Sequence, residues 1–119
     1  MTKGWHILRD EARITLTRRL PPRFDVESRT TLPPMRAVPL AHMIRQDVWR
    51  ALRNVRGFSP VVEITPSPEG LLVRAGGRIE GNFRKETSRF AHITPILLAI
   101  LDNSRNRRRW GNCARERAE

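Results

Sequence analysis

The clearest structural signal in the chain lies in residues 38–56, VPLAHMIRQDVWRALRNVR. Its apolar residues recur every three or four positions, at Leu40, Ile44, Val48, Leu52 and Val55. This spacing is typical of an amphipathic α-helix, because side chains three and four positions apart share one helix face. Pro39 is tolerated near the first turn, Gly57 suits a C-terminal cap, and Pro60 blocks continuation. We therefore predict a helix of about four to five turns that rests on a core.

A β-hairpin is predicted directly after this helix. Residues 61–65 (VVEIT) and 71–75 (LLVRA) have the composition of strands, and residues 66–70 (PSPEG) suit a five-residue loop that ends in glycine. The Gly76-Gly77 pair permits a bend or bulge, and residues 78–83 are a weaker candidate for a third strand. A phosphate-binding nest at this pair is disfavoured, because the lysine and Ser/Thr of a P-loop are missing.

A second helix is predicted near the C-terminus. Thr94 suits its N-cap and Pro95 its first helical position. Its apolar face consists of Ile96, Leu97, Ile100 and Leu101. The element order α-β-β-(β)-α predicts a small two-layer α+β module, in which two amphipathic helices pack on one face of an antiparallel sheet.

Three segments are expected along the chain. Residues 1–37 are predicted to form an extended N-terminal arm, because Pro21-Pro22 and Pro33-Pro34 exclude helix around themselves. Residues 38–102 form the compact α+β module, and residues 103–119 form an arginine-rich C-terminal tail.

The chain is strongly basic. Its 119 residues include 23 Lys and Arg against 12 Asp and Glu, a formal net charge of +11. Such a charge attracts RNA, DNA, anionic lipid or an acidic protein. Only Lys3 and Lys85 are lysines. Arginine-rich coding from a GC-rich genome therefore explains the basic charge as well as a polyanionic partner does.

Nothing in the sequence indicates catalysis. The three histidines, His6, His42 and His92, are far apart, and Cys113 is the single cysteine, so neither a metal site nor a nucleophile–base pair is predicted. No cofactor fingerprint is present, and we expect a protein without enzymatic activity. Without a secretory signal or a membrane-spanning apolar run, a cytoplasmic location is expected.

The best functional candidates are basic residues beside a tryptophan. In the tail, arginines can pair with phosphate and an aromatic ring can stack on a base. The candidate nucleic-acid-binding residues are Arg45, Arg50, Arg53 and Arg56 of the first helix, with Arg105, Arg107, Arg108, Arg109 and Trp110 of the tail. The alternative is that Trp110 closes the core and the arginines solvate a helix end.

Two functions follow from these features. The first is sequence-independent nucleic-acid binding by an accessory protein. The second is a protein-interaction module that docks its proline-rich arm on a larger partner through Phe24, Val26, Leu32, Met35 and Val38. Removal of residues 103–119 is predicted to abolish polyanion binding and to leave the fold intact. Neither the oligomeric state nor the choice among RNA, DNA and a protein partner follows from the sequence.

Overall fold

The predicted amphipathic helix is confirmed and lies at the centre of the molecule. The computed structural model describes residues 4–80 and 87–115, and most of residues 38–56 lie in α1 (Ala37–Leu52), which ends four residues before the predicted stretch does. Leu40, Ile44, Val48 and Leu52 are each no more than 1% exposed. The helix ends before Gly57, whose positive φ of 79° lets the chain turn toward the next strand.

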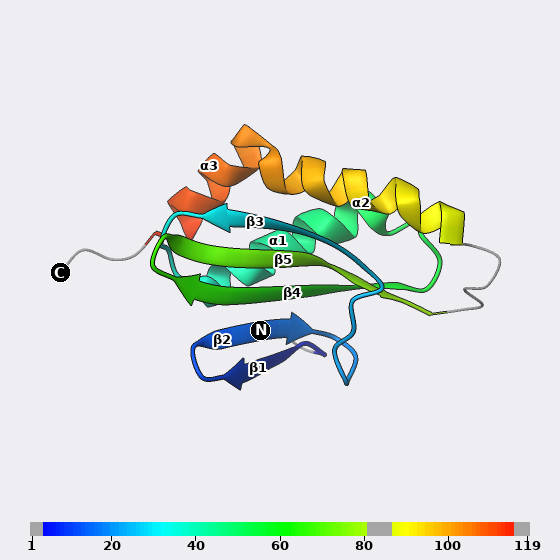
Figure 1. The fold of residues 1–119 in the computed structure, drawn as a ribbon, viewed down its shortest axis with the longest axis horizontal. Helices are drawn as coiled ribbons and strands as arrows, with labels where there is room; N and C mark the ends of the chain where they lie inside the picture. Colours follow the sequence, from blue (N-terminus) through cyan, green and yellow to red (C-terminus); the bar gives the residue numbers. More distant parts are fainter. Residues whose placement is uncertain (1–3, 81–86, 116–119) are drawn as a thin grey trace.

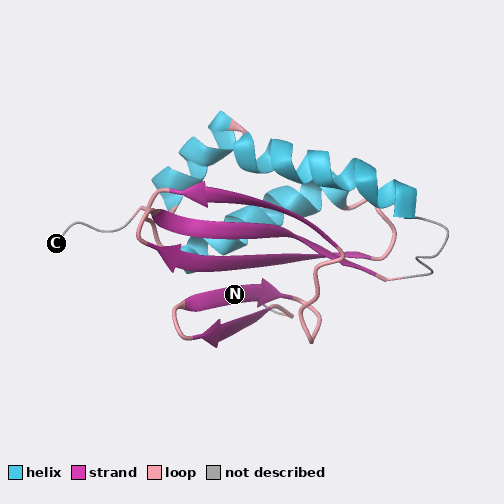
Figure 2. Cartoon of the chain, viewed as in Figure 1, coloured by secondary structure: helices cyan, strands magenta, loops and turns pink. Residues whose placement is uncertain are grey.

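Residues 4–80 and 87–115 form a five-stranded antiparallel sheet with three helices, in agreement with the two-layer α+β prediction. The strands are β1 (His6–Asp10), β2 (Arg13–Thr17), β3 (Val26–Leu32), β4 (Phe58–Ser67) and β5 (Gly70–Ile79). They lie in the order β1-β2-β4-β5-β3. The helices α1, α2 (Thr87–Asp102) and α3 (Ser104–Cys113) cover one face, with α1 against β4 and α2 against β3 (Figures 1 and 2).

The predicted hairpin is present, but its turn is tighter than expected. Strands β4 and β5 pair from Phe58 with Ile79 to Ser67 with Gly70, so the loop has two residues instead of five. Gly70 has a φ of 136°, as predicted for the glycine at the end of the loop. Strand β4 pairs with β2 only over residues 61–64, so the two prolines within β4, at 60 and 66, remove no hydrogen bond from that ladder.

The predicted bend at Gly76-Gly77 is absent. Strand β5 continues through both glycines to Ile79 and pairs with β3 and β4 on its two sides. Residues 78 and 79 therefore extend β5 and do not begin a third strand, and residues 81–83 lie outside the described residues.

Helix α2 begins at Thr87, eight residues before Pro95, the predicted first helical residue, and Pro95 lies inside it. An internal proline costs about 3 kcal/mol in an isolated helix. Here the apolar stripe crosses the proline, because Ile93, Leu97 and Leu101 are all buried. This continuous packing on β3 offsets the hydrogen bond that Pro95 cannot make.

The predicted N-terminal arm is corrected: most of residues 6–32 are three strands of the sheet. Ile14 and Leu16 of β2 and Val26 and Leu32 of β3 belong to the same core cluster as α1. The two proline pairs lie between β2 and β3 and between β3 and α1. Prolines lie in the connections here, and β2 and β3 are stabilised by pairing with β4 and β5, which are distant in sequence.

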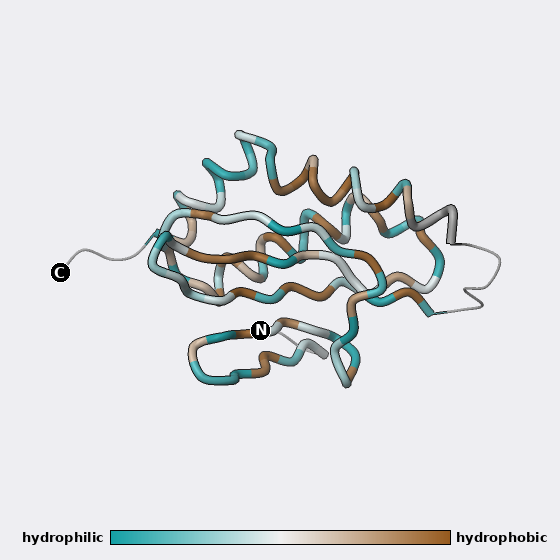
Figure 3. Tube along the Cα trace, in the orientation of Figure 1, coloured by the Kyte–Doolittle hydropathy of each residue, from teal (hydrophilic) through white to brown (hydrophobic). Residues whose placement is uncertain are grey.

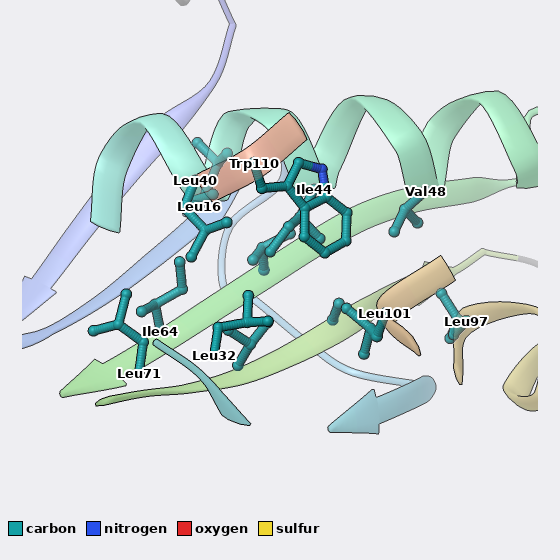
Figure 4. Packing of buried hydrophobic residues seen from close by; sticks show 14 of the residues in the cluster. Leu16, Leu32, Leu40, Ile44, Val48, Ile64, Leu71, Leu97, Leu101 and Trp110 are labelled. Atoms are coloured by element: carbon teal, nitrogen blue, oxygen red, sulfur yellow. The ribbon is translucent and has the colours of Figure 1, made fainter. Parts of the chain in front are cut away.

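The predicted tail is corrected as well, because residues 104–113 form α3. Asn103 caps this helix, its side chain accepting a hydrogen bond from the Asn106 N–H at 3.0 Å. The helix is mostly hydrophilic (Figure 3), but Trp110 is 0% exposed. Its indole lies in the cluster that contains Ile44 and Leu101 (Figure 4).

The sheet face opposite the helices is polar and charge-balanced. Arg74 of β5 donates hydrogen bonds to Glu27 of β3, and its guanidinium lies 4.0 Å from the centre of the Phe24 ring. Glu63 of β4 lies 3.9 Å from Arg74, and Arg29 lies 3.4 Å from Glu27. Cross-strand pairs of opposite charge suit a solvated sheet face.

Acid should weaken the fold through Glu27. The hydrogen bond from Arg74 lowers the pKa of Glu27 below its ordinary value of 4.5. In acid the unfolded chain therefore takes up a proton at a higher pH than the folded chain does. The contribution of Glu27 to stability is complete above about pH 5 and is lost as the pH falls through the folded-state pKa.

Urea unfolding between about pH 6 and pH 3 measures this effect. The free energy of unfolding of Glu27→Gln should fall less on acidification than that of the parent. Glu69→Gln, in the exposed hairpin loop, is the control and should lose as much stability in acid as the parent does. If Glu27→Gln also lost as much stability as the parent, the pH-dependent role of Glu27 would be contradicted.

None of the helices in the described part of the chain is long and apolar enough to cross a membrane.

Candidate functional site

A basic and aromatic hollow of about 440 Å³ lies on one flank of α1. We call it the Trp–Arg hollow. Its lining residues come from the N-terminal segment, the end of β2, α1 and the start of β4: Trp5, Arg18, Arg19, Arg45, Trp49, Phe58, Ser59 and Pro60. Three arginines and two tryptophans thus converge from three parts of the chain.

The fold explains why these residues meet. Arg45 and Trp49 are one turn apart on α1 and therefore share a helix flank. Trp5 precedes β1, and Arg18 and Arg19 follow β2, so the β1–β2 hairpin brings all three to the same end of the sheet. Pairing of β2 with β4 places this hairpin beside the strand over which α1 packs.

Arg45 is the most constrained cation in the hollow. Its guanidinium lies 4.6 Å from the centre of the Trp5 ring, within range of a cation–π interaction. Its Nη2 lies 3.4 Å from Nδ1 of His42, and its buried Nε has no hydrogen-bond acceptor among the described residues. Burial lowers the pKa of Arg45, and burial together with Arg45 lowers that of His42. Arg45 is thus a partly desolvated cation, which attracts anions more strongly than a cation in water does.

Arg18, Arg19 and Arg45 give the hollow its positive charge. Within residues 4–80 and 87–115, no carboxylate lies within 4.0 Å of the guanidinium nitrogens of Arg18, Arg19 or Arg45. Some arginines elsewhere have such partners, for example Arg74 with Glu27, whereas Arg105 and Arg108 have none among the described residues. An anionic group at the hollow would therefore meet cations that are not already paired.

Two of the four arginines predicted in the tail, Arg107 and Arg109, have structural partners. Arg107 bonds the Leu101 carbonyl at 2.8 Å and the Thr30 hydroxyl at 2.6 Å, which ties α3 to α2 and β3. Arg109 pairs with Asp47 of α1. Arg105 and Arg108 are exposed.

Trp110 has the core role that the sequence left as an alternative. The ring is fully buried, and its Nε1 donates a hydrogen bond to Oδ2 of Asp47 at 2.8 Å. The expectation that Trp110 offers a stacking surface for a base is therefore wrong in the folded chain.

The arginines of α1 do not form one surface with α3. Arg45, Trp49 and Arg53 are four residues apart and follow one flank of α1. Asp47 lies about 200° around the helix from Arg45 and contacts Arg109 of α3. The Trp–Arg hollow and α3 are thus on opposite flanks of α1. Arg50, Arg53 and Arg56 are exposed, and none of them lines the hollow.

The sequence prediction missed four important residues of the site, namely Trp5, Arg18, Arg19 and Trp49. The local signal for Trp49 was its position one turn after Arg45 on the shoulder of the apolar stripe. The other three lay in the segment that was interpreted as an extended arm. Their proximity to α1 depends on strand pairing, which has no local sequence signature.

Two further hollows lie on the polar sheet face, with volumes of about 480 and 460 Å³. Both are lined by Glu63 and Arg74. Because Arg74 is paired with Glu27 and stacked on Phe24, these hollows have little free charge to offer a ligand. Among the described residues, no group of three or more His, Cys, Asp or Glu side chains could hold a metal ion.

No protein-family model, curated protein or solved structure matches the chain significantly.

Proposed function

We propose that this chain is a small non-enzymatic accessory protein that binds nucleic acid without sequence preference, through phosphates at the Trp–Arg hollow. The observation that carries the proposal is the convergence of Arg18, Arg19 and Arg45 without a carboxylate partner among the described residues. The net charge of +11 adds long-range attraction to any polyanion.

Arginine is the cation best suited to this role. Its planar fork of N–H donors matches the oxygens of a phosphate, and it stays charged at neutral pH even when burial lowers its pKa. Neutralising phosphates releases condensed counterions, so affinity should fall steeply with salt.

The alternative function is docking of the N-terminal arm on a partner, but the main residues expected to dock are buried in this protein. Val26, Leu32 and Met35 are 4%, 2% and 7% exposed and belong to the core cluster. Val26 and Leu32 lie in β3 and could reach a partner only if this strand left the sheet. The basic surface could still attract an acidic protein, and the experiment below separates the two partners.

The proposal is tested by changing charge at the hollow and elsewhere. Binding of a labelled single-stranded oligonucleotide is measured by fluorescence anisotropy between about 50 and 200 mM salt. The double variant Arg18→Ala/Arg19→Ala should bind about tenfold more weakly. Its plot of log K against log salt should be shallower by about 1.4, at about 0.7 per lost phosphate contact.

The matched control is Arg105→Ala/Arg108→Ala, which removes the same charge from the exposed side of α3. It should bind almost as well as the parent. Equal losses in the two double variants would show that binding follows net charge and not the hollow. Absence of binding at the lowest salt would refute nucleic-acid binding altogether, and an acidic protein would become the better candidate.

A further inference from the structure

We infer that the Trp–Arg hollow selects single strands over duplexes, because an unpaired base stacks on Trp49 while the adjacent phosphates meet Arg18 and Arg19. This inference rests on the proposed nucleic-acid binding and adds the class of strand. It concerns the aromatic residues of the site, whereas the proposed function depends on its arginines.

The two tryptophans of the hollow differ in what already contacts them. Trp5 is partly buried, and the guanidinium of Arg45 lies over its ring. Trp49 is 43% exposed, and no arginine among the described residues stacks on it. Trp49 therefore presents a large apolar surface that a ligand ring can cover.

The neighbours of Trp49 suit a nucleotide better than a purely apolar ligand. Arg18, Arg19 and Arg45 line the same hollow. A ring stacked on Trp49 would have anionic groups attached to it within reach of these cations. An aromatic ring joined to phosphates, as in a nucleotide of a single strand, matches both halves of the site.

A duplex cannot use this arrangement. Its bases are stacked on each other, so a base face reaches a tryptophan only after unpairing, at a cost of a few kcal/mol. Phosphates of a duplex could still meet the arginines. The structure thus predicts weaker duplex binding that makes no use of Trp49.

The test uses three probes of equal phosphate number: a mixed-sequence single strand, the same strand with abasic sites in place of its bases, and a mixed-sequence duplex of half its length. The intact single strand should bind about 5- to 150-fold more tightly than the abasic strand. That range is a stacking energy of about 1–3 kcal/mol for one base, converted at 1.4 kcal/mol per tenfold.

Variants of Trp49 assign the preference to this ring. Trp49→Ala should bind all three probes with the affinity that the parent has for the abasic strand, and Trp49→Phe should keep most of the preference. Leu98→Ala is the control, because it truncates an exposed apolar side chain on a different helix, α2. It should bind the three probes with the affinities of the parent. Because Trp49 is exposed, thermal unfolding of Trp49→Ala should stay close to that of the parent.

The outcomes separate this inference from the proposed function. Equal binding of all three probes by the parent, with the arginine dependence described above, would overturn strand selection and keep phosphate binding. A preference for the single strand that survives Trp49→Ala would also overturn the role of Trp49. Failure of every probe to bind would reject both proposals.

Discussion

Replacing Trp110 with alanine is expected to lower the free energy of unfolding by about 3–5 kcal/mol. The ring is 0% exposed and is among the largest fully buried side chains. The substitution would leave a cavity between α1, α3 and the sheet, and it would also remove the indole donor of the 2.8 Å hydrogen bond to Asp47. Such a loss is a large fraction of the stability of a domain of this size.

Urea unfolding of three variants measures this effect. Trp110→Phe keeps most of the apolar volume and loses the hydrogen bond, so it should fall between the parent and Trp110→Ala. Trp49→Ala removes the same type of ring from an exposed position and should cost less than about 1 kcal/mol. Similar losses for Trp110→Ala and Trp49→Ala would contradict the placement of Trp110 in the core.

The contacts of Trp110 also contradict the prediction from the sequence that removal of residues 103–119 leaves the fold intact. Removal of residues 103–119 would delete α3, and with it Trp110 and the backbone hydrogen bond from the Arg36 N–H to the Ala114 carbonyl at 2.7 Å. We now expect the shortened chain to unfold. A loss of nucleic-acid binding in that truncation would therefore not locate the binding site, and point variants are needed.

Elements with a strong local pattern were predicted well from the sequence. The stripe from Leu40 to Leu52 has the period of a helix, and residues 61–65 and 71–75 are bounded by turn residues. Residues 26–32 form a strand without a comparable signal, because β3 is stabilised by pairing with β5, which is distant in sequence. The start of α2 that was predicted from Pro95 is wrong, because packing of Ile93 and Leu97 on one stripe outweighs the local preference of proline for the first turn of a helix.

The candidate site was predicted only in part, for the same reason. Arg45 was identified because it lies on a recognisable helix. Arg18 and Arg19 could not be placed beside it without knowing that β2 pairs with β4. Trp110, beside a run of arginines, had the composition of a binding site, yet its ring faces inward. In an arginine-rich chain, composition alone does not separate exposed cations from those tied to carboxylates and carbonyls.

Replacing Gly76 with alanine is expected to destabilise the protein by about 3 kcal/mol, the upper end of the usual cost of overpacking. Gly76 lies in β5, where the strand passes close to β3. A Cβ atom added there would lie 1.9 Å from the Val26 carbonyl oxygen and 2.8 Å from the Cα of Glu27. Both are backbone atoms, so no side chain can move aside to relieve the contact.

The position of β3 increases the cost of relieving this contact. Strand β3 is an edge strand, but Ser28 donates to the Thr94 carbonyl of α2 at 3.0 Å and Arg107 of α3 donates to Thr30. A shift of β3 away from β5 would strain both helix contacts.

Gly111→Ala is the matched control, because an added Cβ there meets nothing within 4 Å. In a helix alanine is favoured over glycine by up to about 1 kcal/mol, so the same chemical change should stabilise at 111 and destabilise at 76 in urea unfolding. A neutral or stabilising Gly76→Ala would mean that β3 does not pack against β5 in the register described.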